Sequence, residues 1–98
     1  MEKRIPHCQL SIVKKLIREG KVRSTFSALA GAAALGFDFG AMLKVLLDLT
    51  MNDFYKSMTT YADHRVWQDV YRPTTTAGEV YMKLTVVDEV LIVSFKEL

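Results

Sequence analysis

Tyrosine and lysine side chains lie opposite each other in a hairpin that the C-terminal sequence predicts. An alternating apolar run in this region is interrupted by the polar pair Asp88-Glu89, which is typical of a two-residue turn between antiparallel strands. Counting outward from that turn sets Tyr81 directly opposite Lys96. The expected hairpin therefore carries a phenol and an ammonium group side by side.

The same register divides the hairpin into two faces, because successive side chains of a strand point to opposite sides of a sheet. It pairs Val87 with Val90 next to the turn. The predicted apolar face consists of Met82, Leu84, Val86, Leu91, Val93 and Phe95. The predicted polar face consists of Tyr81, Lys83, Ser94 and Lys96. We expect the apolar face to be core and the polar face to be a reactive surface.

Lysine and tyrosine can together perform metal-free cleavage of RNA through its 2′-hydroxyl. One group accepts the proton of the attacking oxygen, cations stabilise the pentacoordinate phosphate, and an acid protonates the leaving 5′-oxygen. A cluster of cations should lower the pKa of a lysine or tyrosine toward neutrality. By pattern alone, a tyrosine opposite a lysine is also common on a solvated sheet, so a non-catalytic surface stays open at this point.

Other familiar catalytic patterns are absent from the sequence. It has no phosphate-binding glycine-rich loop, no HExxH and no CxxC, and its two histidines, His7 and His64, lie far apart. His64 follows Asp63 in a predicted turn. Cys8 is the single cysteine, so no internal disulfide forms and a reduced compartment is expected. We predict neither a metal site nor a cofactor.

The composition predicts one folded domain over residues 1–98. Hydrophobic residues make up 50% and charged residues 24%, which is typical of a globular protein with a packed core. A formal charge of +2 does not by itself indicate a nucleic-acid partner, although basic residues crowd the N-terminal third. They are Lys3, Arg4, Lys14, Lys15, Arg18, Lys21 and Arg23. A plain solvated helix face also explains this run.

Neither an export signal nor a membrane segment is predicted. The N-terminus lacks the apolar stretch of a signal peptide, and the longest apolar run, residues 41–49, is interrupted by Lys44 and Asp48. We therefore expect a cytoplasmic protein.

Helices are predicted early in the chain and strands late. Helical spacing of apolar residues predicts helices over residues 6–19 and 28–35, while Asp38 and Thr50 are placed to cap a third helix and one further turn. About 6–49 is thus expected to be helical and about 55–98 to form the sheet. This order predicts an α+β fold in which N-terminal helices pack on one face of a C-terminal antiparallel sheet.

Two longer motifs resemble the MqsR toxin family. They are Tyr-Lys-Ser-Met-Thr-Thr-Tyr-Ala-Asp-His at residues 55–64 and Trp-Gln-Asp-Val-Tyr-Arg-Pro at residues 67–73. The likeness includes the opening Met-Glu-Lys-Arg, the Val-Lys-Lys-Leu segment at 13–16 and the C-terminal segment 90–97, so it spans nearly the whole chain. The resemblance implies a RelE-like α+β fold and a toxin of a type II toxin-antitoxin system.

The same resemblance implies an activity and partners. Members of this family are ribosome-independent mRNA endoribonucleases that favour GC-containing triplets such as GCU, and a cognate MqsA-type antitoxin holds them inactive. DNA binding in such a system belongs to the antitoxin. We therefore expect an mRNA substrate, an antitoxin partner and a cytoplasmic role in the stress response.

The family's proposed active-site residues match this sequence at four positions. They are Lys56, Gln68, Tyr81 and Lys96. Our hypothesis is that the two lysines stabilise the pentacoordinate phosphate, that Tyr81 transfers a proton, and that Gln68 orients the phosphate or the 2′-hydroxyl. Alternation alone does not decide whether Gln68 or its neighbour Trp67 faces the core.

RNA contacts are expected beside these four residues. Tyr55 and Met58 flank Lys56 and can stack on or cradle an unstacked base, although either fits the edge of the core as well. Arg72 can contact phosphate or the antitoxin.

Two other functions remain open from the sequence. The chain can be an RNA-binding module without catalysis, or a regulatory protein whose main act is to pair with an antitoxin, by adding strands at an open sheet edge. A DNA-binding regulator is disfavoured, because no helix-turn-helix pattern with base-reading polar residues is present.

Overall fold

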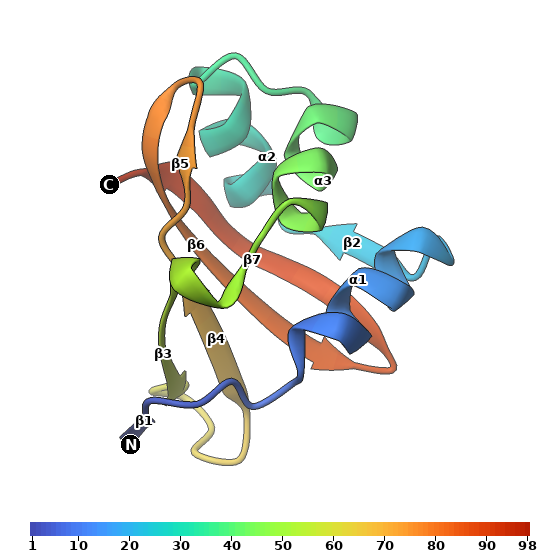
Figure 1. The fold of residues 1–98 in the computed structure, drawn as a ribbon. Coiled ribbons are helices and arrows are strands. Elements are labelled where there is room, and N and C mark those ends of the chain that lie inside the picture. Colours follow the sequence, from blue (N-terminus) through green and yellow to red (C-terminus); the bar gives the residue numbers. More distant parts are fainter.

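A seven-stranded sheet and three helices make up the computed structural model, which describes residues 1–98 (Figure 1). The helices are α1 (Leu10–Arg18), α2 (Phe26–Ala34) and α3 (Phe39–Leu47), followed by a single 3-10 turn, η1 (Met51–Asp53). The strands are β1 (Glu2–Lys3), β2 (Val22–Ser24), β3 (Phe54–Thr59), β4 (Trp67–Tyr71), β5 (Thr74–Thr75), β6 (Gly78–Val87) and β7 (Glu89–Glu97).

The strands are ordered β1-β3-β4-β6-β7-β2, and β5 pairs with β6. All pairings are antiparallel except that of β2 with β7, which is parallel. The predicted α+β fold is confirmed, but the prediction of a helical stretch over residues 6–49 misses β2. This strand is held by long-range bonds, from Val90 N to Lys21 O at 2.9 Å and from Thr25 N to Ile92 O at 3.0 Å. A contact with a distant strand leaves no local alternation pattern in so short a segment.

The first helix begins at Leu10 rather than at the predicted Pro6. The backbone N–H groups of His7 and Cys8 donate to the Asp69 carboxylate, at 2.8 and 3.0 Å, which ties this segment to β4. The residue before the helix, Gln9, is extended (ψ 137°). The helix start is therefore decided by a contact with the sheet and not by helical periodicity.

Side-chain caps begin α2 and α3. Thr25 Oγ1 accepts a bond from Ala28 N at 3.0 Å, and α2 starts two residues before the predicted position 28. Asp38 Oδ1 accepts from Ala41 N at 2.8 Å, which confirms the predicted cap of α3. Thr50 forms a capping box with Asp53 around η1. Local hydrogen bonding thus accounts for these three starts.

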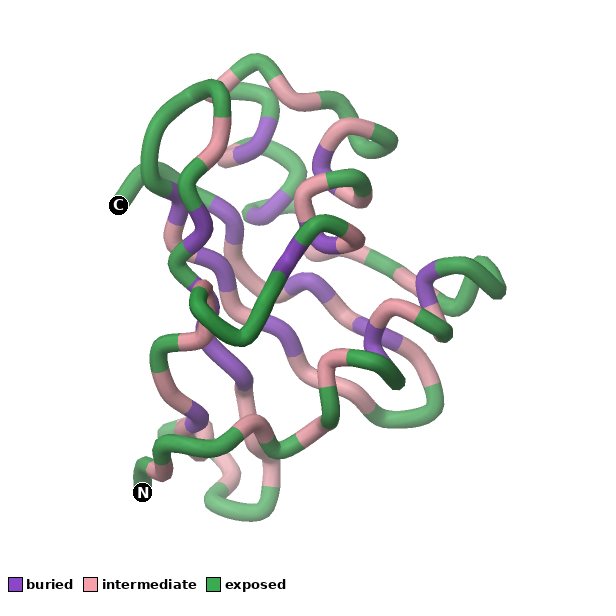
Figure 2. Tube along the Cα trace, viewed as in Figure 1, coloured by how far each residue is buried: buried purple, intermediate pink, exposed green.

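The three helices pack on one face of β6 and β7, where their apolar residues form a single core with the strands (Figure 1). The buried cluster contains Val13, Ile17, Ala28, Ala32, Met42, Leu46, Leu49, Tyr71, Val80, Met82, Leu84, Val90, Ile92 and Phe95. Burial alternates along β6, as expected for a strand with one covered face (Figure 2). No single helix is long and apolar enough to cross a membrane, and α2 and α3 meet that test only as a pair bent by 91°.

The turn of the C-terminal hairpin differs from the predicted one. Val87 pairs with Glu89, so Asp88 alone lies between the paired residues, with a left-handed backbone (φ 65°). Asp tolerates this conformation better than most residues because its short side chain can hydrogen-bond locally. The pairs next to the turn are consequently displaced by one residue, and Val90 and Ile92 face the core in place of the predicted Leu91 and Val93.

A β-bulge then restores the predicted pairing further from the turn. Leu84 pairs with Ile92 but Lys83 pairs with Ser94, so Val93 is an extra residue on β7. The shorter turn displaces the pairing by one residue, and the bulge displaces it by one residue in the opposite direction. Tyr81 therefore lies opposite Lys96, as predicted, although two features of the path between them are different.

The contact between α2 and β7 leaves no room for a side chain at Gly31. A Cβ atom there would overlap the carbonyl oxygen of Phe95, which is backbone and cannot rotate away. We expect Gly31→Ala to lower the free energy of unfolding by about 2 kcal/mol, because overpacking forces α2 away from the sheet. Urea unfolding would measure the loss.

Gly40→Ala is the matched control for this substitution. Gly40 lies in α3, and a Cβ atom added there would have Asp38 Oδ1 as its nearest neighbour, 3.6 Å away. The stability of this variant should be unchanged or higher by less than about 1 kcal/mol, since alanine favours a helix over glycine. Equal losses in the two variants would contradict close packing at Gly31.

Candidate active site

The helix-free face of the sheet carries the predicted active-site residues. Tyr71 lies in the core, so alternation along β4 directs Gln68 and Val70 to the opposite face. The register pairs Lys56 with Val70, and Val70 in turn with Lys83. The tertiary structure thereby decides the side of Gln68, which the sequence left open.

Further cross-strand pairs extend this face over four strands. The pairs are Met58 with Gln68, Lys83 with Ser94, and Tyr81 with Lys96. Residues that are opposed in antiparallel strands share a face. Lys56, Gln68, Tyr81 and Lys96 therefore all project from the side of the sheet that the helices leave uncovered. We call this side the cationic face.

Val70 forms the floor of the cationic face. Its side chain is completely buried, yet it does not belong to the core cluster beneath the helices. Its direct neighbours across the strands are Lys56 and Lys83. We infer that the aliphatic stems of these lysines cover it, which leaves their ammonium groups at the surface.

Two lysines flank the ring of Tyr81. Lys96 Nζ lies 5.5 Å and Lys83 Nζ 5.9 Å from the ring centroid. Both distances are within the range of a cation–π contact, which favours a fixed arrangement of ring and cations. The Tyr81 ring thus lies near two positive charges on the open face.

Three cations surround the ring of Tyr55 at the neighbouring edge of the face. Arg72 lies 4.9 Å, Lys56 5.3 Å and Arg4 5.6 Å from the ring centroid. The tyrosine is 39% exposed, so its ring is not a plug at the edge of the core. A cavity of about 220 Å³ lies beside it, lined in part by Tyr55, Arg72 and Asn52. A planar group has room to approach the ring there.

Lys56 is paired with a carboxylate from the N-terminal strand. Its Nζ donates to Glu2 Oε2 at 2.7 Å. This hydrogen bond raises the pKa of Lys56 above its ordinary value and lowers the pKa of Glu2 below its own. The expectation that neighbouring cations would lower the pKa of the lysine is therefore wrong for Lys56. It is held as an ammonium ion and is unsuited to accept a proton.

Gln68 lies apart from Tyr81 along the cationic face. Asp69 pairs with Leu84, which places Gln68 beside Thr85, and Thr85 is four residues from Tyr81 along β6. At about 3.4 Å per residue, this separation is about 14 Å along the sheet. The four matched residues therefore form an elongated strip, as a surface for a strand of polymer does.

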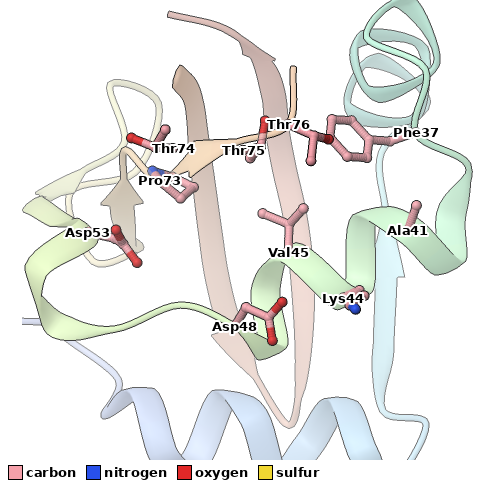
Figure 3. A pocket seen from close by; sticks show the side chains of 10 residues that line it. All are labelled: Phe37, Ala41, Lys44, Val45, Asp48, Asp53, Pro73, Thr74, Thr75 and Thr76. Atoms are coloured by element: carbon pink, nitrogen blue, oxygen red, sulfur yellow. The ribbon is translucent and has the colours of Figure 1, made fainter. Parts of the chain in front are cut away.

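A cavity of about 670 Å³ opens elsewhere, between α3 and the segment 73–76 (Figure 3). Val45, Lys44 and Asp48 line it from the helix, and Asp53 lies across from them. None of the predicted site residues lines this cavity. The RNA substrate expected from the motifs would need an accessible surface more than a deep pocket, which favours the cationic face as the candidate site.

Metal-ligating residues do not gather anywhere in the chain. No three His, Cys, Asp or Glu side chains lie close enough together to hold a metal ion. His64 is exposed in the turn between β3 and β4, where it was expected.

Sequence comparisons decide the family. Residues 5–97 match the family described as "Motility quorum-sensing regulator, toxin of MqsA". The chain is also 61% identical over 97 residues to the protein of Escherichia coli (strain K12) named "mRNA interferase toxin MqsR", and the match covers 99% of both chains. This chain belongs to the MqsR toxin family. The resemblance read from the motifs is confirmed.

Three residues of this MqsR family member join the face without having been singled out from the sequence as site residues. Lys83 lies two residues from Tyr81 on β6, so strand alternation places both on the same face, and the sequence predicted Lys83 on the polar side of the hairpin. Arg4 and Glu2 reach the face through β1, a strand of two residues that no local pattern indicates. Only its pairing with β3 brings them there.

The N-terminal segment of the protein is anchored by a buried carboxylate on the core side of β4. Asp69 accepts bonds from Ser57 Oγ at 2.6 Å and from the backbone N–H groups of His7 and Cys8. Trp67 on the same side stacks on the His7 ring at 5.4 Å. These contacts bring β1 alongside β3 and so position Glu2 and Arg4.

Two titratable groups near this anchor take no part in the cationic face. Burial raises the pKa of the Cys8 thiol and of the Tyr71 phenol, and the charge of Asp69 adds to both effects. The Tyr71 hydroxyl is buried without a hydrogen-bond partner. Both side chains therefore stay neutral and belong to the core side.

Loss of the Asp69 carboxylate should release the N-terminal segment. Asp69→Ala would leave the backbone N–H groups of His7 and Cys8 without an acceptor and would leave Ser57 Oγ with only the Gln68 carbonyl oxygen, 3.4 Å away. We expect this loss to lower the free energy of unfolding by about 3 kcal/mol. Hydrogen exchange of the His7 and Cys8 amides should accelerate. Asp48→Ala serves as the control, since Asp48 is exposed at the end of α3, and its effect should stay within about 0.5 kcal/mol. Slow exchange retained in Asp69→Ala would show that other contacts hold the segment.

The pair Glu2–Lys56 should make stability depend on pH at both extremes. The pKa of Glu2 is lowered on folding from 4.5, so its contribution is complete above that pH and is lost as the pH falls through the folded value. The pKa of Lys56 is raised from 10.5, so its contribution is complete below that pH and is lost as the pH rises through the folded value. Urea unfolding across pH should show the difference between the wild type and Glu2→Gln shrinking toward both extremes. A difference that stays constant into acid would contradict the pairing.

Proposed function

We propose that this protein is the toxin of a type II toxin-antitoxin system and that it cleaves mRNA at the cationic face. Its membership of a toxin family and its 61% identity to a protein named mRNA interferase support endoribonuclease activity. The observation that carries the proposal is the gathering of five cations and two tyrosines on one uncovered face. The cations are Arg4, Lys56, Arg72, Lys83 and Lys96.

The proposed reaction is attack of a 2′-oxygen on the adjacent phosphorus without a metal ion. Tyr81 transfers the proton, because a phenol hydroxyl can both accept and donate one and its ring lies between Lys83 and Lys96. Lys96 stabilises the negative charge that develops on the phosphate. The products are a 2′,3′-cyclic phosphate and a 5′-hydroxyl end. Lys56, kept charged by Glu2, adds electrostatic stabilisation and does not act as the base.

The elongated shape of the site assigns Gln68 and Met58 to a neighbouring part of the RNA. Their distance from Tyr81 along the strands is too large for all of them to hold one phosphate closely. Gln68 offers neutral hydrogen bonds to phosphate, ribose or base, and the Met58 side chain offers apolar contact. This revises the hypothesis that Gln68 orients the scissile group itself.

Selectivity for GC-containing triplets such as GCU is proposed to arise next to Tyr55. An unstacked base can lie on the ring of Tyr55, in the cavity that Arg72 and Asn52 help to line. Such recognition reads free RNA directly, which agrees with cleavage that does not require the ribosome.

Neutralisation by a cognate MqsA-type antitoxin is proposed from the family description, which names a toxin of MqsA. The toxin alone is not expected to bind DNA, and a cytoplasmic location follows from its mRNA substrate. Cleavage should stop when the antitoxin is added in equal amount to the purified toxin.

Cleavage of a defined RNA tests the proposed function. The wild type should cut an oligonucleotide containing one GCU in the presence of EDTA and leave a 2′,3′-cyclic phosphate and a 5′-hydroxyl, read by mass spectrometry. We expect Lys96→Ala and Tyr81→Phe each to lower the rate by about 10²-fold or more, since each removes a group that acts on the transition state. Lys15→Ala, which removes an exposed cation from α1 on the other side of the sheet, is the matched control and should cut at the wild-type rate.

The alternatives predict different results in the same assay. An RNA-binding module would retain the oligonucleotide without producing new ends. A protein that only pairs with an antitoxin would neither bind nor cut it. Loss of cutting in EDTA with recovery on adding a divalent ion would refute the metal-free reaction.

A further inference from the structure

The ion pair between Glu2 and Lys56 differs from an ordinary surface ion pair in how its partners are held. The Lys56 side chain is only 18% exposed, and Val70 lies directly opposite it across the strands. Glu2 is the one carboxylate that bonds to its ammonium group. The remaining two N–H groups of the ammonium have no protein acceptor within hydrogen-bond distance. Lys56 is therefore oriented by one bond and has donors left for a ligand.

Glu2 is itself held in place on both sides along the chain. Before it, the N-terminal ammonium group donates to Thr59 Oγ1 at 3.1 Å, and Thr59 N donates to Met1 O at 3.0 Å. After it, Arg4 donates to Tyr55 O at 3.4 Å. In the register of β1 with β3, Glu2 lies opposite Met58, on the cationic face.

The neighbouring residue on β1 points the other way and strengthens the same anchor. Lys3 lies opposite Ser57, which is buried on the core side, and its ammonium group lies 4.1 Å from the centroid of the Trp67 ring. Beyond it, His7 and Cys8 bond to Asp69. Residues on both sides of β1 thus make contacts that hold the strand, and these contacts fix the position of Glu2.

We propose that Glu2 is a positioning residue of the active site, which holds the Lys56 ammonium at the place where it meets the RNA phosphate. This inference rests on the proposed function and adds to it a residue from an edge strand. A free lysine side chain loses rotamer entropy when it binds a ligand in one geometry. The bond to Glu2 removes much of that freedom before the substrate arrives, as preorganisation requires.

An opposing role for Glu2 leads to a different kinetic result. If the carboxylate merely occupied the phosphate position and had to leave, its removal would improve binding and leave the rate at saturation unchanged. If it positions Lys56, its removal lowers the rate at saturation, because the bound phosphate meets a mobile ammonium group. Removing the Glu2 carboxylate makes the face more positive, so KM should not rise under either role. The two roles are therefore distinguished by kcat.

The test is the steady-state cleavage of the GCU oligonucleotide by Glu2→Gln. Glutamine keeps the size of the side chain and removes its charge. We expect kcat to fall about tenfold while KM stays the same or decreases. Glu89→Gln is the matched control, because it also removes one carboxylate from an ion pair on the sheet, with Arg23, at the far end of β7. Its kcat should equal that of the wild type.

A second measurement reports on Lys56 without activity. The Lys56 ammonium, followed by NMR in the free protein, should titrate at lower pH in Glu2→Gln than in the wild type, and unchanged in Glu89→Gln. Glu2→Ala gives the same comparison if the glutamine variant does not fold.

The outcomes separate this inference from the proposed function. If the wild type cuts, Lys56→Ala does not and Glu2→Gln keeps the wild-type kcat, the positioning role is overturned and the nuclease stands. Equal loss of kcat in Glu2→Gln and Glu89→Gln would also overturn it, since the effect would then be one of net charge. If the wild type itself does not cut, the proposed function fails and this inference fails with it.

Discussion

Each central strand of the sheet contributes residues to the core on one side and to the cationic face on the other. The arrangement of both sides depends on this constraint. Along β6, Met82 and Leu84 enter the core while Tyr81 and Lys83 alternate with them on the open face. A shift of one residue would exchange the two sets, so burial of the apolar set fixes the register and thereby the order of residues on the open face. The bulge at Val93 allows β7 to satisfy both demands across an unusually short turn. The residues proposed to act on RNA are thus positioned by the packing of the same strands on their core side.

The cations of the open face repel one another, and contact with water and with aromatic rings limits this repulsion. Its cations stay in contact with water, and they lie against aromatic rings rather than against one another in a dry pocket. Lys56 has the added compensation of Glu2, which the other lysines of the face lack. Such a surface is poised for a polyanion, because phosphate groups relieve the repulsion that the free protein sustains. Its elongated form agrees with a strand of RNA better than with a small compact ligand.

Residues far apart in the sequence cooperate through β4. On its core side, Asp69 holds the N-terminal segment, and through that segment β1 supplies Glu2 and Arg4 to the cationic face. On its open side, Gln68 and Val70 lie between the neighbouring residues of β3 and β6. One short strand therefore links the stability of the N-terminus to the geometry of the site. This arrangement gives the first residues of the chain a role that their place at a sheet edge would not suggest.

The sequence by itself determined those features that arise from neighbouring residues. Asp38 and Thr50 as caps, the alternation of β6 and the order of helices before strands follow from local hydrogen bonding and periodicity, and long motifs indicated the family. The pairing of Tyr81 with Lys96 was predicted correctly although the predicted turn was wrong, because the shorter turn of the structure and the bulge at Val93 offset each other. Only the tertiary structure decided the side of Gln68, the existence of β1 and β2, and the partnership of Glu2 with Lys56. These depend on contacts between segments distant in the chain, whose geometry no local pattern of residues specifies.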